Sequence, residues 1–424
     1  MSLLPPSFRH RYLHPDPHSS PEAQDLPVVE LRAFTHGLQP ATVPDMMQAF
    51  SEDWRRFGVD AWNEVPNHWR PASGDRVGWW DLPVYLAEEF VAPLLSAPAG
   101  TVILQPHVHW TLQCILSAPE LTQRGTEVVV TDGEFPSVLH SVQQWEDLTG
   151  LSARIIPSRV DGTPDVSAML DAIGDETALC AVSHVGFTTG ARLPDADVQR
   201  LAEASHQNDA WFLLDGYHSA STMPLDVERL GVDFFTGGLL KEASGSSGNA
   251  FVYIREDTEI TPRLTGWFGD ADPFGFQTEP TPHPDVRRRF LGGTTSVASM
   301  YHAVEGVRIL LDAGLGAVCD HSRTLSRRAL QHAQDLGLSL RSPKEPGRQS
   351  AMVLIEVNDA HALCEYLKTR EIYTDSRKNA YLRMAPFVWN NAEEIDRAFA
   401  EIREALDTEA HLTADLQGTA GPVT

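Results

Sequence analysis

The feature that most constrains the fold is an alternation along the chain between short apolar runs and segments of helical periodicity. Seven runs have the length and the β-branched or aromatic content of buried strands. They are TVIL (101–104), EVVVTD (127–132), ARIIP (153–157), ALCAVSH (178–184), AWFLLD (210–215), DFFTG (233–237) and AFVYI (250–254). Strands that alternate with helices pair in parallel through crossover connections. The sequence therefore predicts an α/β fold with a mostly parallel sheet sandwiched by helices.

The pattern changes near Ser296, where longer helical stretches replace the alternation. The stretches are VASMYHAVEGVRILLDAG (297–314) and HSRTLSRRALQHAQDLG (321–337), followed by the short runs MVLIEV, EIYT and YLRMA. This order is typical of a smaller α+β domain, and 424 residues exceed what one core usually supports. We expect an N-terminal arm and helix over 1–60, a large domain over 61–295, a small C-terminal domain over 296–410 and a flexible tail over 411–424.

Charge and cysteine content narrow the class of function. The chain carries 33 Lys and Arg against 58 Asp and Glu, a net charge of −25, which argues against a nucleic-acid or membrane partner and favours small molecules. Its four cysteines have no CxxC spacing, so neither a zinc site nor a disulfide framework is indicated. The N-terminal residues show no signal-peptide pattern, and no apolar run reaches the ~20 residues of a membrane span. We expect a cytoplasmic protein.

Polar residues that end the apolar runs are the first candidates for a ligand site, because ligands of open parallel sheets bind at the carboxyl ends of the strands. They are Gln105, His107, His109, Asp132, Phe135, Ser183, His184, Asp215 and His218. The GxGxxG and GxxxxGK[ST] motifs of dinucleotide and triphosphate sites do not occur.

The pair His107 and His109 keeps a metal-dependent hydrolase open as an alternative, since an HxH pair after a strand can supply two imidazole ligands. That reading needs further ligands at later strand ends, and His184 is the one plausible candidate. We therefore predict no metal site.

Lys241 indicates a different chemistry. It lies between the apolar GGLL and the small residues EASGSSG, and Asp215 and His218 follow an earlier buried run. Pyridoxal phosphate requires a lysine for a Schiff base, a carboxylate for the pyridine nitrogen, a stacking aromatic ring and donors for the phosphate. Desolvation would favour the neutral, nucleophilic amine of Lys241. These residues predict a pyridoxal phosphate site.

Several motifs carry a resemblance to a known family. The segments DGYHSA from Asp215 and GVDFFTGGLLK ending in Lys241 resemble the class V aminotransferase group of fold-type I pyridoxal phosphate enzymes. LTGWFG (264–269) and TDSRKNAYLRMAP (374–386) are similar to segments of kynureninase, and HVGFTTG (184–190) matches more loosely. The likeness spans roughly Leu38 to Ile402. It implies a fold-type I architecture and a homodimer with a shared active site.

The resemblance assigns the residues around the cofactor ring. Lys241 would bear pyridoxal 5'-phosphate, and Asp215 would pair with its pyridine nitrogen. His218 would lie beside the ring, and Phe135 in GEFPS would stack on it. These residues would then activate the substrate amino acid at its α-carbon.

The resemblance also assigns phosphate and substrate contacts. Trp267 and Thr294 would reach the phosphate, Thr294 with the option of doing so across a dimer interface, and the backbone at His107 and Val108 would supply amides. Arg383 would bind the substrate carboxylate through its planar fork of donors. The implied activity is kynureninase-like C–C bond hydrolysis or a related lyase reaction on an amino acid.

Three positions depart from the kynureninase pattern. Leu240 replaces the tyrosine before the lysine, Val138 replaces a second aspartate near the pyridine, and Asp270 replaces the histidine after GWFG. We expect Asp270 to attract a cationic or hydrogen-bond-donating side chain of the substrate. The departures predict that kynurenine itself is a poor substrate.

Two further alternatives remain open and one is disfavoured. A class V aminotransferase needs only the lysine, the aspartate and the carboxylate clamp, and a non-catalytic protein could bind the cofactor to sense or store it. A cysteine desulfurase needs a nucleophilic cysteine shortly before the arginine, but residues 371–383 contain none. Cys364 lies instead on the predicted helix AHALCEYLKTR. The sequence therefore disfavours a desulfurase.

Overall fold

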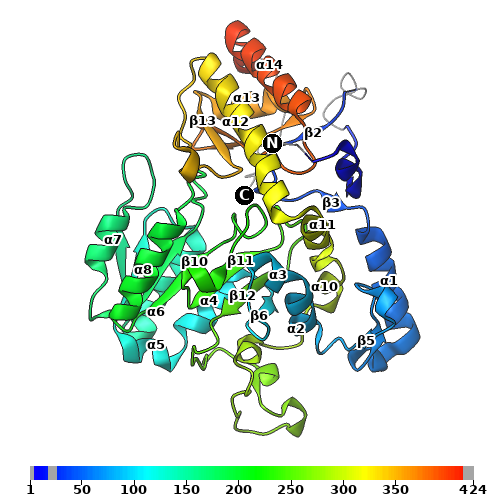
Figure 1. Ribbon diagram of the computed structural model, residues 1–424, viewed down its shortest axis with the longest axis vertical. Coiled ribbons are helices and arrows are strands. Elements are labelled where there is room, and N and C mark those ends of the chain that lie inside the picture. Colours follow the sequence, from blue (N-terminus) through cyan, green and yellow to red (C-terminus); the bar gives the residue numbers. More distant parts are fainter. Residues whose placement is uncertain (1–3, 18–25, 414–424) are drawn as a thin grey trace.

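The structure, a computed structural model, describes residues 4–17 and 26–413 and is built around a seven-stranded sheet (Figure 1). The strand order is β6-β12-β11-β10-β9-β7-β8, and β12 alone runs antiparallel to its neighbours in this sheet. The seven predicted runs form its strands, so the mostly parallel α/β fold is confirmed. The strands are β6 (Val102–Gln105), β7 (Glu127–Thr131), β8 (Ser152–Ile156), β9 (Thr177–Ser183), β10 (Trp211–Asp215), β11 (Phe234–Gly238) and β12 (Ala250–Ile254).

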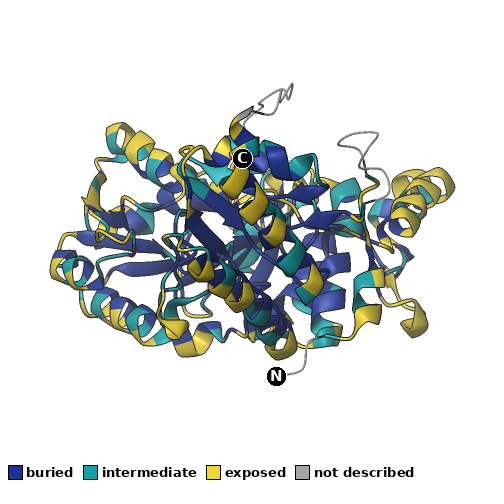
Figure 2. Ribbon diagram, turned by 90° about the horizontal axis from the view of Figure 1, so that it is seen from above, coloured by how far each residue is buried: buried dark blue, intermediate teal, exposed yellow. Residues whose placement is uncertain are grey.

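Helices cover both faces of this sheet, because successive strand side chains point to opposite faces and most of them are apolar. Leu112 of α4 and Val142 of α6 pack on one face, whereas Leu201 of α8 and Met300 of α10 pack on the other. Figure 2 shows the buried strands as a layer between helices with exposed outer sides. The helices around this sheet are α2 (Leu82–Leu86), α3 (Ala92–Leu95), α4 (Val108–Leu116), α5 (Pro119–Arg124), α6 (Pro136–Thr149), α7 (Val166–Ala172), α8 (Asp195–Gln207), α9 (Val227–Leu230) and α10 (Val297–Ala303).

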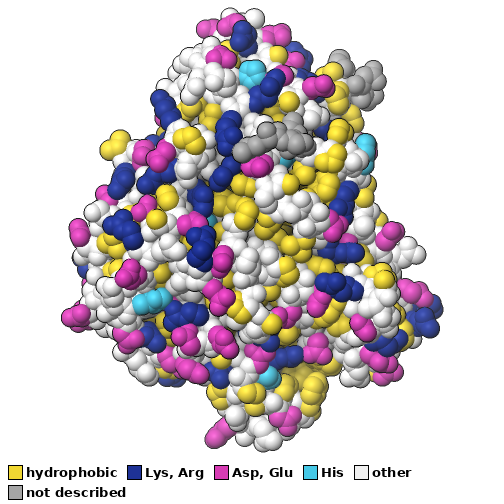
Figure 3. All heavy atoms as spheres, in the orientation of Figure 1, with side chains coloured by type: hydrophobic (Ala, Val, Ile, Leu, Met, Phe, Trp, Pro, Cys, Tyr) yellow, Lys and Arg dark blue, Asp and Glu magenta, His cyan; other side chains and the backbone are white. Residues whose placement is uncertain are grey.

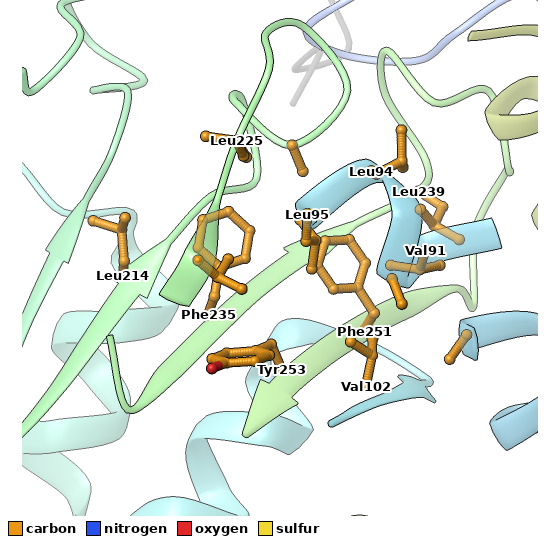
Figure 4. Packing of buried hydrophobic residues seen from close by; sticks show 14 of the residues in the cluster. Val91, Leu94, Leu95, Val102, Leu214, Leu225, Phe235, Leu239, Phe251 and Tyr253 are labelled. Atoms are coloured by element: carbon orange, nitrogen blue, oxygen red, sulfur yellow. The ribbon is translucent and has the colours of Figure 1, made fainter. Parts of the chain in front are cut away.

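Aromatic side chains fill the core beneath β11 and β12 (Figure 4). The rings of Phe235 and Phe251 lie nearly parallel, with centroids 6.3 Å apart and an interplanar angle of 15°. Leu94 and Leu95 of α3 belong to the same cluster. Burying one such ring removes roughly 150–250 Å² of surface from water. This packing stabilises β11, the strand that precedes Lys241.

A second lobe contains an antiparallel sheet of order β13-β16-β15. Its core also includes Val29 of the N-terminal segment, which pairs through β2 (Val29–Glu30) with β14 (Ile372–Tyr373). The early chain therefore packs beside residues more than 300 positions later (372 − 29). The other elements of this lobe are α12 (Leu315–Asp335), β13 (Val353–Glu356), α13 (Ala360–Lys368), β15 (Asp375–Arg377), β16 (Tyr381–Met384), α14 (Ala392–Thr408) and α15 (Ala410–Thr413).

The stretch 297–314, expected as one long helix, is two helices. α10 ends at Ala303 and α11 (Glu305–Ala313) follows after Val304. Val297 and Met300 of α10 pack in the core of the large sheet, near α1 (Val43–Phe57) and α2. Within residues 4–17 and 26–413, no helix is long and apolar enough to cross a membrane. Most of the tail expected over 411–424 lies outside the described residues.

Candidate active site

A cavity of about 470 Å³ opens at the carboxyl ends of the central strands. Its walls come from the large sheet, from the N-terminal segment at Phe34 and Thr35, and from the second lobe at Arg377 and Arg383. Seven of the nine predicted site residues line it: His107, Val108, Phe135, Asp215, His218, Lys241 and Arg383. The parallel topology thus gathers residues that lie far apart in the sequence.

Lys241 follows β11 and projects its amine into this cavity. Nζ lies 3.0 Å from Nε2 of His218 and 4.3 Å from the centroid of the Tyr217 ring. Burial lowers the pKa of Lys241 to about 8, against the opposing influence of the Glu242 and Asp215 carboxylates. With that pKa a minor share of the amine is neutral near pH 7, larger than for an ordinary lysine, and this share can act as a nucleophile or proton acceptor.

His218 connects Lys241 to a buried carboxylate. Burial and the nearby Lys241 charge lower the pKa of His218 to about 4, so its ring is neutral at pH 7. Nε2 accepts a hydrogen bond from the lysine amine, which leaves the ring proton on Nδ1, 3.5 Å from Oε1 of Glu242. Glu242 is buried beside the lysine. The three side chains form a row that orients the amine.

Asp215 ends β10 and is 8% exposed. Its Oδ1 accepts a hydrogen bond of 2.9 Å from the backbone N–H of Tyr217. Burial raises the pKa of Asp215, and the Tyr217 N–H and the Lys241 charge oppose that rise. A cationic N–H group in the cavity would donate a charge-assisted hydrogen bond to the Asp215 carboxylate. This bond would keep the carboxylate ionised.

Two helix starts border the cavity. Phe135 immediately precedes α6, and its ring meets Phe187 edge-on with centroids 5.4 Å apart. His107 caps α4 by accepting a hydrogen bond of 3.0 Å from the Trp110 N–H at Nδ1. Backbone N–H groups at such a start suit a phosphate. The geometry agrees with an aromatic ring and a phosphate bound at these positions.

Arg383 lies on β16 and is 3% exposed. Its Nη2 lies 2.6 Å from Oδ2 of Asp375, its Nη1 donates to the Phe187 carbonyl at 3.2 Å, and its guanidinium lies 3.9 Å from the Phe34 ring centroid. Burial lowers the pKa of Arg383 to about 10, so it stays cationic at pH 7. Its buried Nε has no hydrogen-bond partner among the described residues.

Trp267 and Thr294 do not line the cavity of their own chain. Their segments lie side by side, since the Gly266 N–H donates to the Leu291 carbonyl at 3.2 Å. Trp267 is 36% exposed and Thr294 is also exposed. The expected phosphate contacts of these residues stay a prediction, and neither residue forms part of the cavity wall of its own chain.

The three departures from the kynureninase pattern separate in space. Leu240 and Val138 line the cavity and give it apolar wall where the pattern has polar groups. Asp270 does not line it, because its carboxylate accepts the backbone N–H groups of Asp272 at 2.8 Å and Thr281 at 2.9 Å. The expectation that Asp270 attracts the substrate side chain is thus wrong for the cavity of its own chain. Asp270 stabilises its loop.

Sequence reasoning missed several cavity residues and neighbours. Phe34 and Arg377 come from segments that the strand-end argument does not reach. Glu242 and Glu134 carried a visible signal, since each is an acidic residue beside a predicted site residue, but neither was considered. His184 is fully buried and does not line the cavity. Over the described ranges, no group of three or more His, Cys, Asp or Glu is placed to hold a metal ion.

Comparisons with known proteins identify the family and the fold of this chain. Residues 87–378 match the family model described as aminotransferase class V. An "uncharacterized aminotransferase YcbU" of Bacillus subtilis is 32% identical over 73% of this chain and 80% of its own length. A kynureninase of Pseudomonas fluorescens is 25% identical over 92% of each chain. A cysteine desulfurase structure from Thermococcus onnurineus NA1 superposes with a TM-score of 0.75 at 21% identity, covering 92% of this chain and 98% of that one.

A second solved structure has the same fold: a lysine-to-alanine mutant of C-DES with glycine linked covalently to its pyridoxal phosphate cofactor, at a TM-score of 0.75 and 20% identity over 92% of this chain and 99% of that one. A buried lysine with a lowered pKa and a buried aspartate, both at the carboxyl ends of central strands, suit the same cofactor. Fold and site together define a pyridoxal-phosphate-dependent enzyme. The chain belongs to the aminotransferase class V family.

Proposed function

We propose that this enzyme acts on an amino acid whose carboxylate is bound by Arg383 and whose α-proton is moved by Lys241. The observation that carries the proposal is the convergence of Lys241, Asp215 and Arg383 on one cavity. Pyridoxal phosphate, when bound, supplies a carbonyl group for the substrate amine and a ring that accepts electrons from the α-carbon. The remaining work falls to side chains of this chain.

Lys241 is the proposed acid and base. With a pKa of about 8, Nζ can take a proton from the α-carbon and return it near neutral pH. His218 holds the amine through Nε2 and is itself oriented by Glu242. Asp215 is proposed to hold the ring nitrogen protonated, because its buried carboxylate gains a cationic partner there.

Arg383 is the proposed carboxylate clamp. Asp375 fixes one edge of its guanidinium and Phe34 fixes its plane. Its buried Nε has no hydrogen-bond partner among the described residues. A bidentate Arg–carboxylate pair sets both position and direction, so it would align the α-proton with Lys241.

The leading reaction is kynureninase-like. Water would add to a carbonyl group on the substrate side chain, the bond between that carbon and the β-carbon would break, and alanine and an acid would leave. The 25% identity with a kynureninase, over 92% of this chain, supports this branch. The apolar Leu240 and Val138 support a substrate other than kynurenine.

Transamination is the second candidate. It would move the amino group to a keto acid acceptor and needs no proton donor for a side-chain carbonyl. The 32% identity with the uncharacterized aminotransferase supports it. The lysine, the aspartate and the arginine described above suffice for this reaction.

Proton exchange and product analysis test the proposal together. The loaded enzyme is incubated with single amino acids in heavy water, with and without a keto acid acceptor, and deuterium at the α-carbon and all products are read by NMR. We expect exchange with at least one amino acid, its loss in Lys241→Ala, and a strong reduction in Arg383→Lys. Alanine release without an acceptor identifies the hydrolytic branch. Exchange that survives in Lys241→Ala would refute the proton-transfer role.

We further propose a homodimer in which a second copy supplies Trp267 and Thr294 to the cavity. Both residues are exposed and lie outside the cavity of their own chain. Phe274 and Phe276 next to them are 56% and 77% exposed. Figure 3 shows hydrophobic side chains on the protrusion at the bottom of the view. In Figure 1 this protrusion is the stretch of chain that connects β12 to α10. Apolar exposure of this kind marks interaction surfaces.

A cytoplasmic location is also proposed. All four cysteines of the chain lie in described segments and are buried free thiols. Thiols persist in reducing compartments. Cell fractionation would test this location.

A further inference from the structure

Glu134 is a buried acidic residue to which none of the roles above assigns a task. It is 3% exposed and precedes Phe135, yet it does not line the cavity. A carboxyl group is rarely buried so completely unless it has partners. Its partners lie at the ends of the strands that build the active site.

Two adjacent strands hold the Glu134 carboxyl. Oε1 accepts a hydrogen bond of 2.7 Å from the Thr131 hydroxyl at the end of β7, and Oε2 accepts one from the Ser183 hydroxyl at the end of β9. Ser183 lines the cavity and is the register partner of Asp215 on β10. The Glu134 carboxyl is thus one side chain removed from the carboxylate proposed to hold the pyridine nitrogen.

The charges facing Glu134 are those of a coupled carboxyl pair. Burial raises the pKa of Glu134 to about 7; the two hydroxyl donors oppose the rise, and the Asp215 charge adds to it. The other titratable neighbour is the buried thiol of Cys180 on β9, whose pKa is raised mainly by burial. The Lys241 charge lowers the pKa of Asp215 and so opposes the effect of burial. Two close carboxyls without a cation cannot both ionise easily.

We propose that Glu134 is a positioning residue for the cofactor ring, which acts through Ser183 and Asp215 to add a second negative charge that stabilises the protonated pyridine nitrogen. The inference rests on the proposed placement of the ring against Asp215. A cationic N–H at Asp215 neutralises that carboxylate, so the repulsion that holds the proton on Glu134 falls. Thr131 and Ser183 then stabilise the ionised Glu134 through their hydroxyl groups.

Binding of two matched probes to the cofactor-free protein tests the inference. The probes are pyridoxal phosphate and its 1-deaza analogue, in which C–H replaces the ring nitrogen. The measured quantity is the dissociation constant of the deaza analogue divided by that of pyridoxal phosphate, at pH 8. Effects of a substitution on phosphate binding or on attachment to Lys241 are common to both probes and cancel in this ratio. Glu134→Gln should reduce the preference for pyridoxal phosphate by about tenfold. This is the effect expected when one partly screened negative charge behind Asp215 is lost.

Other variants separate the possible outcomes. Ser183→Ala keeps the carboxyl, removes its link to the cavity and should shift the ratio in the same direction by a smaller factor. Glu127→Gln, at the opposite end of β7 and paired with Arg154 at 3.2 Å, should leave the ratio unchanged. Asp215→Asn reports on the proposed function itself and should shift the ratio most.

Suppose that Asp215→Asn weakens the preference for pyridoxal phosphate over the deaza analogue, while Glu134→Gln and Ser183→Ala leave that preference unchanged. This result would overturn the inference about Glu134 but not the placement of the ring against Asp215. An unchanged ratio in Asp215→Asn would overturn the placement of the ring. If Glu134→Gln does not fold, as judged by its melting transition, Ser183→Ala decides the result.

Discussion

Lys241 owes its chemistry to a few neighbours whose effects on its pKa compete. Burial lowers that pKa, and Glu242 and then Asp215 oppose the change, with a net value of about 8. His218 cannot add a charge near pH 7, because its own pKa is about 4. A single carboxylate, Glu242, therefore has a large influence on when the lysine becomes reactive.

The pH dependence of cofactor attachment follows from these values. Below a pKa of about 8 Lys241 is protonated and unreactive, so attachment to the cofactor-free protein should accelerate as the pH rises through about 8. Stopped-flow absorbance after mixing with pyridoxal phosphate measures the rate. Glu242→Gln removes a group that raises the lysine pKa, so the midpoint should move to lower pH. An unchanged midpoint in this variant would show that Glu242 does not act on Lys241.

Asp215→Asn should leave the cofactor bound and slow turnover strongly. A neutral amide cannot hold the ring nitrogen protonated, and loss of one charge-assisted hydrogen bond costs about 1.5–3 kcal/mol, or roughly tenfold to more than a hundredfold in rate. Steady-state kcat on the substrate found by proton exchange gives the measurement. Asp132→Asn, which changes an exposed aspartate after strand β7, is the matched control. If Asp215→Asn turns over as fast as Asp132→Asn, Asp215 does not hold the ring nitrogen protonated.

At the scale of elements, the strands were predictable because each is a short, continuous apolar run. The rule that ligands bind at the carboxyl ends of parallel strands predicts Asp215, Phe135 and His107 at one site, and all three line the cavity. Phe34 and Arg377 were not predictable in this way, because long-range packing between two lobes brings them to the cavity. The same limit applies to Asp270, whose loop hydrogen bonds decide its role.

The end of β11 shows why this element is rich in glycine. A Cβ on Gly238 would lie 2.2 Å from the Tyr217 ring, which in turn lies against the Lys241 amine. Gly238→Ala should destabilise the protein by about 1–3 kcal/mol through overpacking and should weaken cofactor binding. Urea unfolding and cofactor titration measure the two effects. Gly174→Ala, where a Cβ would meet nothing within 4 Å, should show neither effect. Wild-type stability in Gly238→Ala would contradict this packing.

At the scale of the whole molecule, one copy forms most of the cavity but leaves Trp267 and Thr294 outside it. The resemblance assigns both residues to the phosphate. The positions of the strand ends do not indicate whether the two residues reach the cavity of their own chain or the cavity of a second copy. Their exposure gives the proposed dimer a functional consequence. Each cavity would be completed by its partner.

Mixing two inactive variants tests this consequence. Lys241→Ala lacks the amine, and Trp267→Ala lacks the proposed cross-subunit contact. After subunit exchange, about half of the dimers are mixed, and each mixed dimer contains one cavity with both residues intact. The mixture should therefore recover about one quarter of wild-type activity. Activity no higher than the mean of the separate variants would show that Trp267 acts within its own chain or not at all.

The central claim is that the cavity around Lys241 and Asp215 is the pyridoxal phosphate site, and the position of the covalent attachment tests it most directly. Borohydride reduction of the cofactor-loaded protein, followed by proteolysis and mass spectrometry, locates the modified lysine. We predict modification on the peptide that contains Lys241, and no attachment in Lys241→Ala. Stoichiometric modification of any other lysine in the wild-type protein would contradict the account.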